Sequence, residues 1–133
     1  MKLIMSPASP FARKVRVAIH ELDLADRIEE MPVQTTALAS DPAAVAANPS
    51  GRIPALVRPE GPAIHDSRVV CRFVDALAGG GLYPEPRLWE VLTLEATGHA
   101  LSEAALAMVY EARFKGTVGA SAAWIEEIGR AHV

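Results

Sequence analysis

The first 34 residues constrain the fold most, because they alternate a strand, a helix and a strand. Lys2 to Met5 is a short apolar run, and Ile28 to Gln34 is a second strand candidate that Pro32 weakens. Between them, Pro10 suits the first turn of a helix. Apolar residues then recur at helical spacing: Phe11, Val15, Ala18, Ile19 and Leu22. This order favours two parallel strands joined by a right-handed crossover.

A turn and a hairpin follow this opening unit. Asp41 to Ala47 predicts one short helical segment, and Asn48-Pro-Ser-Gly51 is a strong turn signal. Ala55 to Val57 and Ala63 to His65 flank Glu60-Gly61 as two strands of a hairpin would. Two antiparallel strands are therefore expected after the crossover.

Helices dominate the rest of the chain. Asp66 or Ser67 can cap a helix that the glycines at 79–81 end, and its apolar stripe is Val70, Phe73, Val74 and Leu77. Pro84 and Pro86 form a linker, after which a long helix is predicted from about Leu88 to Phe114. This change in composition predicts a domain boundary.

Composition excludes several classes of function. With 133 residues, half of them apolar, the chain can bury one complete core and part of a second. A net charge of -3 without a basic block argues against nucleic acid as a partner. Cys71 is the only cysteine, which excludes an internal disulfide, a CxxC redox pair and a cysteine-rich zinc site. The N-terminus lacks the apolar run of a signal peptide or membrane span, so we expect a cytoplasmic protein without membrane association.

Three segments together resemble the glutathione transferase family in order and spacing: Ser6-Pro-Ala-Ser-Pro-Phe-Ala-Arg-Lys-Val-Arg16, Asn48-Pro-Ser-Gly-Arg-Ile-Pro-Ala-Leu-Val57 and Ile64-His-Asp-Ser-Arg-Val-Val70. The resemblance implies an α/β fold: a thioredoxin-like β-α-β-α-β-β-α domain at residues 1–80, then the start of an all-α domain at residues 86–133. That second part is expected to be truncated. Its last six residues, Ile128 to Val133, match the translation of a common sequencing adapter, so we expect them to be artefactual.

Glutathione carries two carboxylates, an ammonium and a thiol, so its site needs anion-binding helix ends and a donor for the thiolate. Ser9 precedes Pro10 at a helix start, where a hydroxyl and free amides can face one anion. By pattern alone Ser9 is equally a simple N-cap. The resemblance assigns Ser9 as the catalytic donor, and Ser6 in the same loop is the alternative.

The resemblance implies the remaining contacts with glutathione. A cis Ile53-Pro54 bond would let the Ile53 backbone pair with the cysteinyl unit of glutathione, whereas by pattern alone a trans proline starting an edge strand is the alternative. Asp66 would meet the glutamyl ammonium and Ser67 the glutamyl carboxylate, although the pair is also a good helix cap. Arg52 could reach the glycyl carboxylate, although a lone arginine in a turn is more often solvated, and Phe11 of the first matched segment is assigned to the glutathione site. No metal site is expected.

Other polar residues have a structural interpretation. Arg13, Lys14 and Arg16 are expected on the solvent face of the first helix. His65 is interpreted as structural, and Cys71 as a small buried apolar residue.

The sequence thus predicts a transferase that binds glutathione as cosubstrate, stabilises its thiolate and conjugates it to a small electrophile, with a homodimer as the full-length form. The 133-residue chain itself is expected to be inactive. A non-catalytic module of the same fold, used for binding or dimerisation, remains the alternative, because fold alone does not decide activity. The missing CxxC motif argues against a thioredoxin-like oxidoreductase. The electrophile and the family class are not encoded in these residues.

Overall fold

A computed structural model describes residues 1–36 and 38–114. Its elements follow the predicted order, with single 3-10 turns at Ala25–Arg27 and Glu85–Arg87. They are β1 (Lys2–Met5), α1 (Pro10–Glu21), β2 (Glu29–Pro32), α2 (Pro42–Ala47), β3 (Ala55–Val57), β4 (Ile64–His65), α3 (Ser67–Leu77) and α4 (Leu88–Phe114). The predicted thioredoxin-like α/β fold, followed by the start of an all-α part, is confirmed.

The four strands form one mixed sheet in the order β2-β1-β3-β4. β1 and β2 are parallel, as the helical crossover between them requires, whereas β3 is antiparallel to both β1 and β4. β2 is an exposed edge strand, and Pro32 is its last residue. This position tolerates a proline, because fewer ladder hydrogen bonds are lost at an edge.

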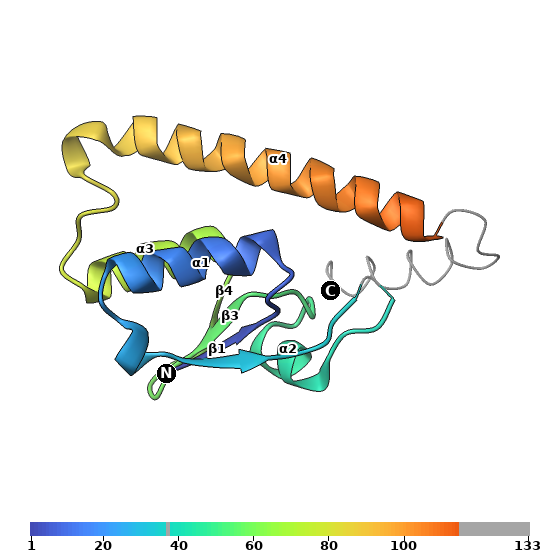
Figure 1. Cartoon of the computed structure of the whole chain (residues 1–133). Coiled ribbons are helices and arrows are strands. Elements are labelled where there is room, and N and C mark those ends of the chain that lie inside the picture. The colour runs from blue at the N-terminus through green and yellow to red at the C-terminus, as the bar shows by residue number, and fades with distance from the viewer. Residues whose placement is uncertain (37, 115–133) are drawn as a thin grey trace.

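Helices cover both faces of the sheet (Figure 1). Alternate side chains of a strand point to opposite faces. Leu3, Met5 and Leu56 accordingly pack with α1 and α3, while Ile4 and Ala55 pack with α2. The alternation in the strands thus places α1 and α3 side by side on one face and α2 on the other.

The long helix α4 lies across the outer side of α1 and α3 (Figure 1). It follows a linker that begins after α3 at Gly79, Gly80 and Gly81, all three of which have positive φ. Residues 115–133, including the six-residue segment Ile128 to Val133, lie outside the described part of the chain. Among the helices described, none is long and apolar enough to cross a membrane.

Candidate functional site

Three loops of the thioredoxin-like domain meet at one edge of the sheet. β1 ends where β3 begins, because Ile4 pairs with Ala55, and β3 begins where β4 ends, because Ala55 pairs with His65. The loop before α1, the loop before β3 and the start of α3 therefore share this edge. This register brings the starts of α1 and α3 to the same end of the sheet.

Ser9 is the N-cap of α1. Its Oγ accepts a hydrogen bond from the Ala12 amide at 3.2 Å, and its own amide donates to the Ser6 carbonyl at 3.0 Å. The capping function that the sequence offered as an alternative is thus present. An accepting hydroxyl retains its proton, so the cap leaves Ser9 able to donate to an anion at the helix start.

The turn before β3 is organised by Asn48, which is buried. Its side-chain amide donates to the Arg52 carbonyl at 2.9 Å, and its Oδ1 accepts from both the amide and the hydroxyl of Ser50. Gly51 adopts a φ of +67°, and a Cβ there would lie 2.4 Å from Ser40 Oγ. These contacts position the peptide bond between Ile53 and Pro54, which is cis. The Arg52 side chain is exposed.

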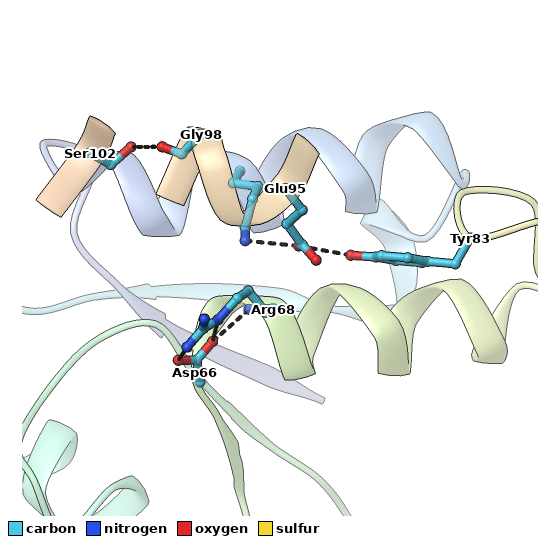
Figure 2. Close-up of polar contacts among 7 residues, drawn as sticks. Asp66, Arg68, Tyr83, Glu95, Gly98 and Ser102 are labelled. Atoms are coloured by element: carbon cyan, nitrogen blue, oxygen red, sulfur yellow. Dashed lines mark hydrogen bonds and ion pairs between the residues drawn. The ribbon is translucent and has the colours of Figure 1, made fainter. Parts of the chain in front are cut away.

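Asp66 caps α3 in an unusual backbone conformation, with φ at +68°. Few non-glycine residues adopt this region, and those that do cluster at functional sites. Its Oδ1 accepts from the Arg68 amide at 2.9 Å and from Arg68 Nε at 3.0 Å, and its Oδ2 lies 2.8 Å from Arg68 Nη2 (Figure 2). These bonds lower the pKa of Asp66 to about 2. Asp66 is therefore a fixed negative charge at this edge of the sheet.

We expect Arg68→Gln to raise the pKa of Asp66 from about 2 toward the ordinary 3.8, since the bonds from Arg68 are what lowers it. A lowered pKa in the folded state contributes stability above the ordinary pKa that is lost as pH falls toward 2. Most of that acid-side loss of stability should therefore disappear in the variant. NMR titration of the Asp66 carboxyl measures the shift, and Arg72→Gln on the same helix is the control. A pKa that stays near 2 in Arg68→Gln would contradict this account.

Ser67 is the first residue of α3 and is only 2% exposed. Its hydroxyl has no hydrogen-bond partner among the described residues. Buried hydroxyls are normally paired, and an unpaired one usually indicates a missing water, ion or ligand. The Ser67 hydroxyl, close to the free amides of a helix start, is suited to an anion.

Helix α4 forms one wall of a pocket at this edge of the sheet, and the sequence interpretation did not predict that pocket. A pocket of about 200 Å³ lies between α1 and α4. Its lining residues are Pro10, Phe11, Lys14, Glu95, Gly98, His99 and Ser102. The polar residues of α4 at this pocket, spaced three and four apart on an alanine-rich helix, were the available signal.

Within this pocket, the ring of Phe11 lies 4.9 Å from the ring of His99. The His99 side chain is 12% exposed, and its Nδ1 is buried without a partner among the described residues. Lys14 was expected on the solvent face of its helix, but its Nζ instead lies 3.0 Å from Glu95 Oε1. That expectation was wrong because the partner is 81 residues away in the sequence.

The described residues provide neither a cluster of metal ligands nor a thiol that is ionised at neutral pH. No group of three or more possible metal-ligating side chains occurs in residues 1–36 and 38–114. Cys71 is buried, as predicted, and burial raises the pKa of its thiol to about 11. Because this thiol stays protonated at neutral pH, thiolate chemistry at this edge requires a thiol from a ligand.

The sequence model of the glutathione S-transferase N-terminal domain matches residues 8–77, which is more than half of the chain. The chain belongs to the glutathione S-transferase family. The matched region contains all three loops of the site, from Ser9 to Ser67. The resemblance inferred from the three sequence segments is thereby confirmed. No curated protein sequence matches the chain.

Solved glutathione transferases share this architecture. A family member from Pseudomonas fluorescens Pf-5 with bound glutathione has a TM-score of 0.82 and 30% identity, over 98% of this chain and 66% of that one. The P. fluorescens Pf-5 family member with bound S-(propanoic acid)-glutathione has a TM-score of 0.74 and 28% identity, over 98% of this chain and 64% of that one. A glutathione S-transferase from Methylobacillus flagellatus KT with glutathione bound has a TM-score of 0.70 and 31% identity, over 98% of this chain and 64% of that one. The chain thus spans 64–66% of the length of these glutathione transferases.

Proposed function

We propose that this chain binds glutathione at the shared edge of its sheet and belongs to a transferase that conjugates glutathione to a small electrophile. The observation that carries the proposal is the unpartnered, buried hydroxyl of Ser67 at the start of α3. The γ-glutamyl carboxylate of glutathione would supply the acceptor that this hydroxyl lacks. The similar structures from P. fluorescens and M. flagellatus contain glutathione, which supports the same ligand here.

Asp66 complements Ser67 in this proposal. Its carboxylate is fixed by Arg68 but keeps one lone pair, on Oδ2, for the glutamyl ammonium. The Ile53 backbone is proposed to pair with the cysteinyl unit of glutathione. Arg52, which is exposed, is proposed to reach the glycyl carboxylate. Phe11 would then lie beside the sulfur, in the wall of the pocket between α1 and α4.

Ser9 is proposed to stabilise the glutathione thiolate. Its hydroxyl keeps a proton to donate, and the Phe11 amide and the positive end of the α1 dipole would also interact favourably with a negative sulfur. The thiol releases its proton to water, and the thiolate attacks the electrophilic carbon. A carbon–sulfur bond forms while the bond from that carbon to its leaving group breaks, and the leaving group departs with that electron pair, so the cosubstrate itself is the nucleophile. Ser6 remains the alternative donor.

The pocket between α1 and α4 is proposed to hold the electrophile next to the sulfur. It begins at Pro10, the residue after Ser9, and its α4 wall includes His99. Accommodation of a substituent on the sulfur is consistent with the P. fluorescens structure that contains S-(propanoic acid)-glutathione. In this proposal residues 1–80 form the glutathione-binding domain and residues from 86 onward form the helical domain. A homodimer and a cytoplasmic location remain predictions.

An NMR titration of isotope-labelled protein with glutathione tests this placement. We expect the largest amide shifts at the starts of α1 and α3 and at Ile53, because all three loops would contact the ligand. A separate groove, lined by residues that include Arg58 and Phe73, serves as an internal control. Shifts confined to that groove, or no shifts at all, would contradict the proposed site.

A further inference from the structure

The face of α4 that meets α1 is polar at its centre. Partly buried positions recur at helical spacing along α4 from Leu88 to Tyr110, and Glu95, His99 and Ser102 follow one another within this series. By contrast, the large apolar residues Leu94 and Leu101 are 73% and 69% exposed. The contacts described between α1 and α4 at this centre are the Phe11–His99 ring contact and the Lys14–Glu95 bond.

Glu95 joins three separate elements at this face. Its Oε1 accepts from Lys14 Nζ of α1 at 3.0 Å and from the Tyr83 hydroxyl of the linker at 2.9 Å (Figure 2). The Glu95 side chain is only 10% exposed and that of Lys14 31%. An ion pair this shielded from water is more costly to break than an exposed pair, because the remaining charge loses its partner without full solvation.

Tyr83 is itself held firmly by α3. The Arg72 guanidinium lies 4.6 Å from the centre of the Tyr83 ring. The neighbouring Leu82 amide donates to the buried Asp75 carboxylate at 2.8 Å. Burial and the acceptor Glu95 raise the pKa of Tyr83 far above its usual value, so its hydroxyl remains a donor at neutral pH. The linker thus presents a fixed donor to α4.

We propose that Glu95 is a positioning residue, which holds α4 against α1 and thereby sets the width of the pocket beside Ser9. Lys14 and Glu95 are both part of the pocket wall, so the bond between them fixes the separation of its two sides. This inference rests on the proposed function, because the pocket matters only if a group attached to the glutathione sulfur occupies it. Loss of Glu95 would free Lys14 and Tyr83 together and let α4 move away from α1.

Hydrogen exchange tests the positioning without any ligand. We expect Glu95→Ala to accelerate amide exchange in α4 by about tenfold. Glu95→Gln keeps an oxygen that accepts from Lys14 and Tyr83, and should retain most of the protection. The matched control is Glu90→Ala on the same helix, which removes the exposed ion pair between Glu90 and Arg87. Unchanged α4 exchange in Glu95→Ala, with the sheet equally protected in all variants, would overturn the proposal.

Calorimetric titrations with glutathione and S-hexylglutathione separate positioning from a general structural role. The hexyl chain would enter the pocket, so the wild type should bind S-hexylglutathione about tenfold more tightly than glutathione. In Glu95→Ala this ratio should fall toward one while the affinity for glutathione stays within about twofold, and Glu95→Gln should restore most of it. Equal losses for both ligands would overturn the positioning role. Absence of glutathione binding in the wild type would instead refute the proposed function, and the exchange experiment would still decide on Glu95.

Discussion

Replacing Ser67 by alanine is expected to weaken glutathione binding about 10- to 100-fold, because a hydrogen bond to a charged group is worth roughly 1.5–3 kcal/mol. The same substitution should not destabilise the fold. The Ser67 hydroxyl has no partner among the described residues, and the N-cap of α3 is Asp66, so no observed hydrogen bond is lost. Removing an unpaired buried hydroxyl can even stabilise the protein by up to about 1 kcal/mol. Opposite effects on binding and stability are the signature of a ligand-binding group.

Calorimetry with glutathione and thermal unfolding measure these two effects. Thr97→Ala is the matched control, because its hydroxyl donates only to the Thr93 carbonyl within α4. The control should change neither the affinity for glutathione nor the fold appreciably. If Ser67→Ala bound glutathione as tightly as the wild type, the hydroxyl would have no ligand contact and its burial would need another explanation.

Replacing Ser9 by alanine is expected to raise the thiol pKa of bound glutathione by about one to two units, the equivalent of one hydrogen bond to a charged sulfur. The reason is that the Ser9 hydroxyl accepts from Ala12 and has its proton available for the thiolate. The substitution also removes the cap of α1, which costs about 1 kcal/mol of stability. The thiolate absorbance of the complex, followed as a function of pH, measures the pKa.

Ser9→Asp separates capping from donation. Aspartate caps a helix as well as serine does, so stability should be retained. Its carboxylate offers no proton and adds a negative charge, so the thiol pKa should rise further than in Ser9→Ala. Ser6→Ala should leave the thiol pKa unchanged. The reverse pattern, with a rise only in Ser6→Ala, would transfer the donor role to Ser6, and no rise in either would favour the non-catalytic binding module.

Local patterns were sufficient to predict the elements of the thioredoxin-like domain. Pro10 after Ser9, the turn at Asn48 to Gly51 and the glycines at 79–81 are signals whose physical cause lies within a few residues. The crossover and the hairpin leave few strand orders, and the pairing of β1 with β3 in the structure selects one of them. Once that order is set, pairing brings the three loops of the site to one edge of the sheet.

Contacts between distant segments could not be predicted in this way. The sequence pattern indicated a solvated Lys14, because the local pattern does not show where the helix that carries its partner, Glu95, lies in space. The same is true of His99, whose tilted ring contact with Phe11 depends on how α4 crosses α1. The unpaired state of the Ser67 hydroxyl is likewise a property of the packed structure, because a serine at a helix start reads equally well as a satisfied cap.

The central claim is that the start of α3 holds the γ-glutamyl end of glutathione. Calorimetric titration of the chain with glutathione and with cysteinylglycine, which lacks the γ-glutamyl residue, tests it most directly. We predict that one glutathione binds per chain and that cysteinylglycine binds at least about tenfold more weakly, since it cannot reach Asp66 and Ser67. Equal affinities for the two peptides, or no heat of binding with glutathione, would contradict the account.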